Sequence, residues 1–205
     1  MEHTCERTFA MIKPDAFYRG AVAEVLGRFE DAGLQVAMAY TTEPDPDQVR
    51  QHYADVGETY GDDLMDQLID YMADEPVMPL VLEGRNSVRK ARSMAGETQP
   101  LEAENGTVRG DLSSYGFDDA QDEAVALPNL VHAADSQESA RREIELWGLD
   151  DHTVAYRRPD VDWLALKNSS YDDLDVEQQR RIEEEHGIDQ DTAAELYDSI
   201  LQSFE

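Results

Sequence analysis

The order of apolar patterns predicts an α+β protein with a ferredoxin-like, split βαβ antiparallel sheet that is covered by helices on one face. Short apolar runs alternate with segments whose apolar residues recur at helical spacing, in the order strand–helix–strand, two helices, strand–helix–strand–helix. No internal repeat or low-complexity tract interrupts this order. A chain of 205 residues with 40% hydrophobic content is large enough to bury the core of such a domain.

Four apolar runs predict the strands. The first run stops at Pro14, because proline cannot donate to a continuing ladder. The second and third runs are bounded by turn residues or by the ends of helical patterns. The expected strands cover residues 8–15, 34–41, 77–84 and 129–133.

Five segments show helical spacing. In the first, Val22, Val25 and Phe29 share one face and Gly33 follows as a stop. The stretch 96–128 has no clear period and carries Gly, Pro, Asn and Ser, so we expect a long loop there. The expected helices cover residues 20–33, 45–56, 62–73, 86–95 and 136–147.

The composition changes at about residue 150. Beyond it the chain is acidic, and two segments, 175–186 and 192–204, have helical character, the second with Thr192 and Glu195 as a capping box. We therefore expect one domain over 1–150 and an acidic helical extension over 151–205 that packs on the domain or on a neighbouring subunit.

The charge is strongly unbalanced. The chain has 17 Lys and Arg against 46 Asp and Glu, a net charge of −29, which opposes binding to nucleic acid and to anionic membranes. The acidic residues are spread along the whole chain, which favours a halophilic, salt-adapted protein over an acidic interaction protein. Cys5 is the single cysteine, and we see no signal peptide and no apolar run of membrane length, so we expect a cytoplasmic protein.

A basic cluster stands out against this background. Arg85, Arg89 and Arg92 fall on one face of the helix expected over 86–95, and such a face suggests a bound polyanion. For Arg85 and Arg89, pairing with surrounding carboxylates is the simpler interpretation. Arg92, Arg109 and Lys13 could clamp a polyphosphate through side chains and a metal, because the chain has no glycine-rich phosphate loop.

His132 ends the fourth expected strand, just before a helix. On composition alone it is a core or edge histidine. Beside a cationic clamp, however, a neutral imidazole can attack phosphorus, provided that an acceptor such as Glu143 holds its other ring nitrogen. The remaining histidines show no ligand spacing, so we expect no zinc site.

Five stretches decide between these interpretations. "ERTFAMIKPDA", "HYADV", "VLEGRNSVRKARSMAGETQP", "GTVRGDLS" and "NLVHAADSQESARREIELW" occur in order over residues 6–148, and together they resemble the nucleoside diphosphate kinases. The resemblance implies transfer of the γ-phosphate of ATP to a nucleoside diphosphate through a phosphohistidine, with ping-pong kinetics, on a ferredoxin-like fold. It also implies Mg²⁺, held mainly by the nucleotide phosphates, and a homo-oligomer, either a hexamer or a tetramer.

The resemblance assigns roles residue by residue. His132 matches the nucleophile, Glu143 the carboxylate that orients it, and Tyr53 a tyrosine beside it; Lys13 is expected to act in catalysis as well as in binding. The nucleotide-binding positions are Lys13, Arg92, Thr98 and Arg109 for the phosphates, Asn129 for the sugar and Tyr60 for stacking on the base.

The chain departs from the family pattern in several places. Ala134 replaces a serine that would hold the glutamate, no Lys or Arg occurs over residues 51–84, and the loop after Arg109 is longer than usual. The alternative is therefore a catalytically weak nucleotide-binding or regulatory relative. An acidic partner-binding module with the same fold would explain the charge but not the basic cluster.

Overall fold

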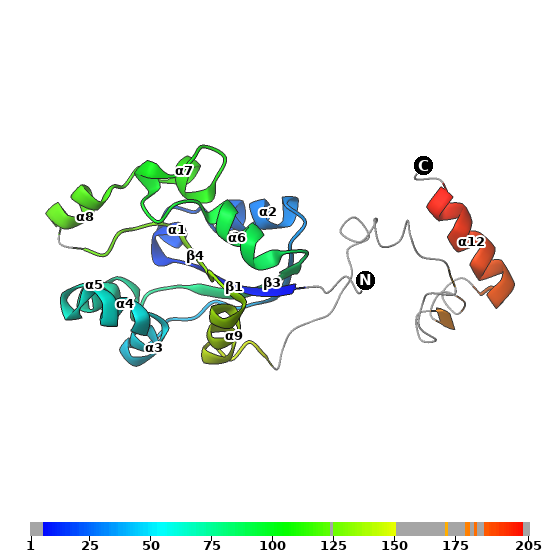
Figure 1. Cartoon of the computed structure of the whole chain (residues 1–205), viewed down its shortest axis with the longest axis horizontal. Helices are drawn as coiled ribbons and strands as arrows, with labels where there is room; N and C mark the ends of the chain where they lie inside the picture. The colour runs from blue at the N-terminus through cyan, green and yellow to red at the C-terminus, as the bar shows by residue number, and fades with distance from the viewer. Residues whose placement is uncertain are drawn as a thin grey trace. The chain divides into compact units, whose positions relative to one another are not determined.

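A computed structural model describes residues 6–123 and 125–150 and, further along the chain, residues 171, 179–180, 183 and 187–202. The chain divides into two compact units, Met1–Tyr156 and Arg157–Glu205. The first unit contains the sheet and most of the described helices (Figure 1). None of the helices in the described part of the chain is both long and apolar enough to cross a membrane.

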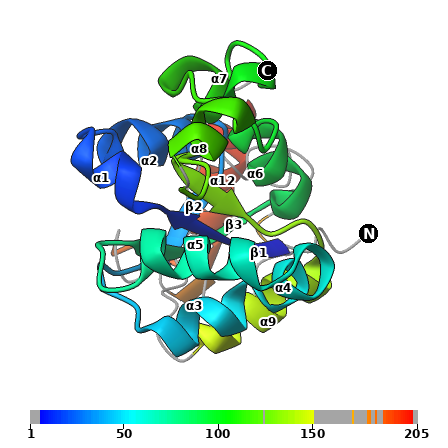
Figure 2. The same cartoon turned by 90° about the vertical axis from the view of Figure 1, so that its left-hand side faces the viewer.

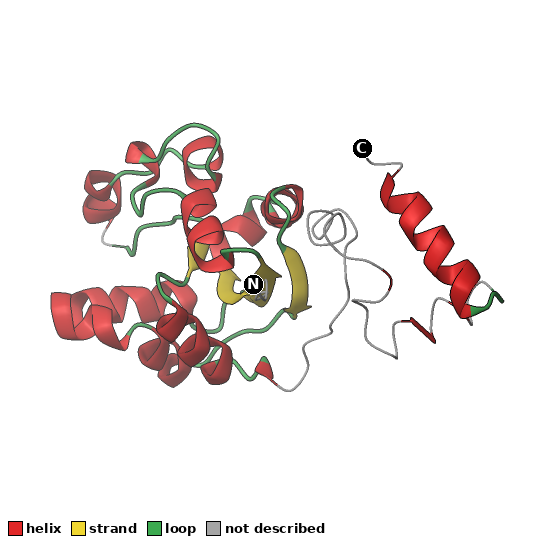
Figure 3. Ribbon diagram, turned by 45° about the vertical axis from the view of Figure 1, so that its right-hand side comes forward, coloured by secondary structure: helices red, strands yellow, loops and turns green. Residues whose placement is uncertain are grey.

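The sheet of the first unit has four strands, which Figure 3 shows in yellow. They are β1 (Glu6–Ile12), β2 (Gln35–Ala39), β3 (Met78–Gly84) and β4 (Val131–Ala133). The strand order is β2-β3-β1-β4 and every pairing is antiparallel. This order confirms the predicted ferredoxin-like sheet. It also places β4 beside β1, with His132 opposite Met11.

Helices cover both faces of this sheet, and not one face as the sequence analysis expected (Figure 2). Successive residues of β1 alternate between two cores: Phe9 and Met11 belong to one, Ala10 and Ile12 to the other. Continuous apolar runs are typical of strands that are buried on both faces. The helices on one side are α1 (Pro14–Tyr18), α2 (Val22–Asp31), α6 (Ser87–Ala95) and α7 (Val108–Leu112), and those on the other are α3 (Pro46–His52), α4 (Ala54–Tyr60), α5 (Asp62–Met72) and α9 (Gln137–Leu146).

The helix expected over residues 45–56 is divided in two. Asp45 caps α3 by accepting a hydrogen bond from the backbone N of Gln48 at 2.8 Å, and Pro46 occupies the first turn. The chain then turns at Tyr53 and continues as α4, which ends at Gly61 with a φ of 92°. Tyr53 therefore lies in a corner between two helices, which directs its ring toward the centre of the unit.

The stretch 96–128, expected as a loop, contains three short helices. They are η1 (Pro100–Glu102), α7 and α8 (Phe117–Glu123). Local polar contacts hold them: Thr107 caps α7 by accepting a hydrogen bond from the backbone N of Gly110, and Leu101 N donates to the carbonyl of Tyr115 at 3.1 Å. Elements this short bury too few side chains to leave a periodic apolar pattern.

The described part of the second unit includes the helix α12 (Gln190–Gln202). Its cap differs from the expected capping box: Asp189 accepts a hydrogen bond from Thr192 N at 2.9 Å, so the helix begins before Thr192. The helix expected over 175–186 lies mostly outside the described residues. The role of 151–205 as an extension stays a prediction.

Candidate active site

A cavity of about 260 Å³ opens where β1, β4, α3, α6 and α9 meet. Eight of the nine residues expected from the sequence line it: Lys13, Tyr53, Arg92, Thr98, Arg109, Asn129, His132 and Glu143. Tyr60, the ninth, is 71% exposed at the last position of α4 and is not among the lining residues. Its stacking on a base therefore stays a prediction.

Strand β4 and helix α9 place the histidine and the glutamate together. The Ser136 hydroxyl caps α9 by accepting a hydrogen bond from the backbone N of Ser139 at 3.1 Å. Glu143 then follows almost two turns into the helix, buried and facing β4. One of its oxygens, Oε2, lies 2.9 Å from Nε2 of His132. The carboxylate thus contacts Nε2 and leaves the other ring nitrogen, Nδ1, available to face the cavity.

Burial and nearby cations keep the His132 ring neutral. Desolvation lowers the pKa of His132 well below its ordinary value, and the charges of Lys13, Arg109 and Arg92 lower it further. When Glu143 accepts a hydrogen bond from the protonated Nε2, the lone pair of the neutral ring lies on Nδ1. Desolvation also raises the pKa of Glu143 to about 7. The pair therefore changes its hydrogen bonding within the physiological pH range.

Lys13 lies directly after β1 and is buried. Its ammonium donates to Oδ1 of Asn129 at 2.8 Å, and the Asn129 amide donates to the carbonyl of Thr98 at 3.0 Å. Burial, followed by the charge of Arg109, lowers the pKa of Lys13 to about 7. An anion in the cavity would favour the charged form of Lys13, so this lysine is suited to bind phosphate.

The turn that leads into β4 is strained and firmly held. Leu130 has a φ of 65°, which is unusual for a residue other than glycine. The Asp15 carboxylate accepts a hydrogen bond from Leu130 N at 3.0 Å and one from the Tyr71 hydroxyl at 2.6 Å. Lys13 N donates to the Leu130 carbonyl at 2.9 Å. These contacts fix the turn, and with it the position of His132.

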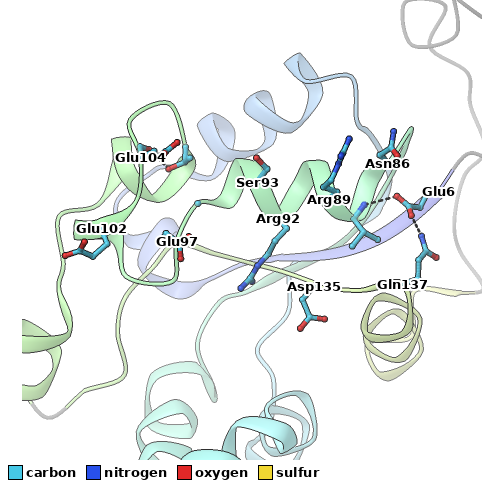
Figure 4. A pocket seen from close by; sticks show the side chains of 13 residues that line it. Glu6, Asn86, Arg89, Arg92, Ser93, Glu97, Glu102, Glu104, Asp135 and Gln137 are labelled. Carbon is cyan, nitrogen blue, oxygen red and sulfur yellow. Dashed lines mark hydrogen bonds between the residues drawn. The ribbon is translucent and has the colours of Figure 1, made fainter.

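Arg92 reaches the cavity from α6 and donates to the carbonyl of Ala133 at 3.1 Å. The expected face of three arginines is not formed, because α6 begins at Ser87 and Arg85 precedes it. Figure 4 shows Arg89 and Arg92 pointing in opposite directions, with Arg92 turned toward Asp135. Both arginines line a larger groove of about 1020 Å³, but only Arg92 also lines the cavity.

Arg109 lies deeper, and only 2% of its surface is exposed. Its guanidinium donates to three backbone carbonyls: Nε to Asn129 at 3.1 Å, Nη1 to Gly96 at 2.8 Å and Nη2 to Val131 at 2.6 Å. It therefore joins the chain after α6 to the start of β4. Arg109 brings a positive charge to the cavity and holds two of the cavity walls together.

Sequence reasoning missed His52, which also lines the cavity. Its ring centroid lies 4.6 Å from that of His132, and its Nδ1 accepts a hydrogen bond from Trp147 Nε1 at 3.3 Å. The ring is buried, which lowers its pKa well below the ordinary value and keeps it neutral. Its position next to Tyr53 in the sequence is a signal that the "HYADV" stretch already contained.

Three of the cavity side chains, His52, His132 and Glu143, lie close enough together to ligate a metal ion. One atom each from His52, His132 and Glu143 lies within 4.8 Å of the others, and this is the one such group found in the described part of the chain. Spacing along the sequence could not reveal it, because three separate elements contribute the side chains. A metal ion bound to all three would replace the hydrogen bond between His132 and Glu143 and would occupy the candidate nucleophile.

Comparison with known proteins identifies the family. The family model described as nucleoside diphosphate kinase matches residues 6–152. The nucleoside diphosphate kinase of Archaeoglobus fulgidus is 39% identical over 159 residues, which cover 78% of this chain and 97% of that protein. The enzyme of Halorubrum lacusprofundi is 37% identical over 166 residues, which cover 80% of this chain and 96% of that protein.

Solved structures agree. The transition-state mimic of the Borrelia burgdorferi nucleoside-diphosphate kinase with bound vanadate and ADP superposes with a TM-score of 0.74 at 31% identity, covering 77% of this chain and 95% of that chain. The halophilic Halobacterium salinarum enzyme in complex with CDP gives a TM-score of 0.67 at 29% identity. The match covers 78% of this chain and 99% of that chain. The cavity, its histidine–glutamate pair and these matches lead to one conclusion: the chain belongs to the nucleoside diphosphate kinase family and is a phosphotransferase that acts on nucleotides.

Proposed function

We propose that the chain transfers the γ-phosphate of ATP to another nucleoside diphosphate, with His132 as the nucleophile. The observation that carries this proposal is the 2.9 Å contact between Nε2 of His132 and Oε2 of Glu143. When Glu143 is ionised, this contact favours the neutral tautomer whose lone pair lies on Nδ1, the atom that we propose attacks phosphorus.

The reaction has two half-reactions through one pocket. In the first, the Nδ1–phosphorus bond forms while the bond from phosphorus to the bridging oxygen breaks, and the departing diphosphate keeps the electron pair. In the second, a terminal oxygen of the acceptor diphosphate attacks the phosphohistidine, and Nδ1 regains its lone pair. Because one pocket serves donor and acceptor in turn, the kinetics are ping-pong.

The cavity residues offset the charge of the transferring group. Lys13, Arg92 and Arg109 supply positive charge beside the ring, as their effect on the pKa of His132 indicates. The Tyr53 hydroxyl is buried and has no hydrogen-bond partner among the described residues, so it can donate to a phosphate oxygen. Thr98 and Asn129 lie at the same wall, where they can contact the phosphates and the sugar.

Mg²⁺ fits this site as a partner of the nucleotide. Asp55 and Asp135 line the cavity and offer carboxylate oxygens, which Mg²⁺ prefers together with substrate phosphates. We expect the ion to be held mainly by the nucleotide phosphates. When bound, Mg²⁺ neutralises charge on the β- and γ-phosphates.

The setting of the enzyme follows from its composition and its relatives. The net charge of −29 favours a cytoplasm of high salt concentration, and one of the similar structures is described as a halophilic enzyme. We also propose a homo-oligomer, a hexamer or a tetramer, with the acidic helical extension over 151–205 appended to a catalytic domain over 1–150. The alternative of a catalytically weak relative is less favoured, because the cavity keeps His132, Glu143 and the three cations together.

Phosphate labelling tests the proposal. Incubation with γ-labelled ATP and Mg²⁺ should label the full chain with an acid-labile, base-stable phosphate, and added nucleoside diphosphate should release it. His132→Ala should not be labelled but should still bind nucleotide, whereas His3→Ala, a change outside the described residues, should be labelled normally. Full labelling of His132→Ala, or intersecting kinetic lines for the unmodified enzyme, would contradict the proposed role.

A further inference from the structure

Arg142 lies on α9 next to Glu143 and lines the catalytic cavity, yet neither its sequence context nor the assignments above give it a role. Its Nη2 atom lies 3.0 Å from Oδ2 of Asp55 on α4 and 3.9 Å from Oε1 of Glu143. The guanidinium therefore sits at the edge of the histidine–glutamate pair and bridges two helices that border the cavity.

The other cations of the cavity already donate hydrogen bonds to buried or partly buried groups. Arg109 donates to three backbone carbonyls, Arg92 donates to one, and Lys13 donates to Asn129 while burial lowers its pKa to about 7. All three line the cavity together with His132, beside the transferring group. The phosphate behind that group carries further negative charge, and an additional guanidinium at the edge of the cavity could donate hydrogen bonds to it.

Arg142 can change partner more easily than they can. Its side chain is 44% exposed and that of Asp55 is 74% exposed. Ion pairs as exposed as this one contribute little to stability, because water solvates both charges and salt screens them. A guanidinium can bind a phosphate, like a carboxylate, through two parallel hydrogen bonds, so a phosphate can replace Asp55 as the partner of Arg142.

We propose that Arg142 is a phosphate-binding residue of this enzyme: when a nucleotide enters, its guanidinium leaves Asp55 and donates to the phosphate behind the transferring group. This inference rests on the proposed function of the cavity. It also accounts for the absence of Lys and Arg over residues 51–84, a stretch that includes Asp55 and borders the cavity. On the side of the cavity that α4 borders, Arg142 on α9 supplies the positive charge instead.

Nucleotide binding to the full chain, measured by calorimetry at fixed ionic strength, tests this role without requiring turnover. Arg142→Gln should weaken ADP binding about tenfold, which corresponds to about 1.4 kcal/mol, and should change AMP binding less than twofold. Arg142→Lys should restore part of the loss, because lysine keeps the charge without the planar fork. When the titration is done without Mg²⁺, Asp55→Asn should tighten ADP binding, since it removes the carboxylate that competes for Arg142.

Arg141→Gln is the matched control. Arg141 is the neighbouring exposed arginine on α9, and it lines a different groove with Glu6 and Glu145. The same change of charge there should leave ADP binding unaltered. Unchanged ADP binding by Arg142→Gln, an equal loss for ADP and AMP, or an equal effect of Arg141→Gln would overturn the inference.

The inference and the proposed function can fail separately. If the unmodified chain forms a phosphohistidine but Arg142→Gln binds ADP normally, the function stands and the role of Arg142 is wrong. If no phosphohistidine forms but Arg142→Gln selectively loses ADP affinity, the phosphate site stands and the chemistry assigned to His132 is wrong.

Discussion

Replacing Arg109 by alanine should destabilise the fold strongly as well as slow phosphate transfer, whereas replacing Arg92 should mainly slow transfer. Both guanidiniums line the cavity and both lower the pKa of the candidate nucleophile. Arg109, however, donates to the backbone carbonyls of Asn129, Gly96 and Val131, while Arg92 donates to a single carbonyl. Comparison of the two variants therefore separates the structural role of a cavity cation from its chemical role.

The magnitude follows from the carbonyl groups left behind. A buried acceptor that loses its partner costs about 1–3 kcal/mol. The Val131 and Gly96 carbonyls lose the guanidinium, whereas the Asn129 carbonyl still accepts a hydrogen bond from Val131 N at 2.7 Å. Two acceptors that lose this donor cost about 2–6 kcal/mol, toward the lower end because the bond to Gly96 is only partly buried. For a chain of this size, that corresponds to a decrease in Tm of roughly 4–24 °C. Arg92→Ala breaks one partly buried bond, so we expect a decrease of only a few degrees.

Thermal unfolding followed by circular dichroism in molar KCl measures this difference, and a phosphate-exchange assay on the same samples measures activity. Both variants should lose transfer by about a hundredfold or more, since each removes a guanidinium from a dry phosphate site. Arg109→Lys is the control: it keeps a charge but cannot reach three carbonyls, so it should lose stability and keep some activity. Melting temperatures of Arg109→Ala and Arg92→Ala within about 2 °C of each other would refute the reasoning.

Two further predictions concern pH and salt. In kcat/KM, which reports the free enzyme, the pH profile should have an acid limb near pH 7, because burial raises the pKa of Glu143 to about 7 and only the carboxylate accepts a hydrogen bond from Nε2–H of His132. The glutamine of Glu143→Gln cannot titrate, so this variant should transfer phosphate more slowly and its pH profile should lack the acid limb. If the acid limb persists, it belongs to another titrating group. With a net charge of −29, the fold should melt at lower temperature in dilute buffer than in molar KCl, where charges are screened beyond about 3 Å. Identical melting curves in both solutions would contradict salt adaptation.

The sequence predicted most of the sheet and the long helices, because their apolar patterns are strong. Strand β3 and helix α6 fall within a residue or two of the expected ranges. Coverage of both sheet faces was missed, although the unbroken apolar run from Phe9 to Ile12 is typical of a strand buried on both sides. The short helices within 96–128 depend on caps such as Thr107 and on long-range backbone bonds, which leave no period to detect.

The candidate site was predicted largely from the resemblance and not from periodicity. Motif positions assign His132 and Glu143 without any knowledge of distance, and the 2.9 Å contact between them now gives that assignment a physical basis. His52 and Arg142 escaped notice for a common reason. Each lines the cavity only because separate helices and strands pack together, and neither stands at a sequence spacing that indicates a functional site.

The distribution of charge suggests how such an enzyme can bind phosphate in molar salt. Screening at that ionic strength suppresses interactions between exposed charges, so it relieves the repulsion among the surface carboxylates. The same screening would weaken a phosphate clamp built from exposed lysines. Lys13 and Arg109 are instead 5% and 2% exposed, where salt and water penetrate least. Arg142 is the exception, since its ion pair with Asp55 lies at the surface. Salt should therefore loosen that pair first, and it should weaken a contact of Arg142 with phosphate in the same way, while the buried cations keep their strength.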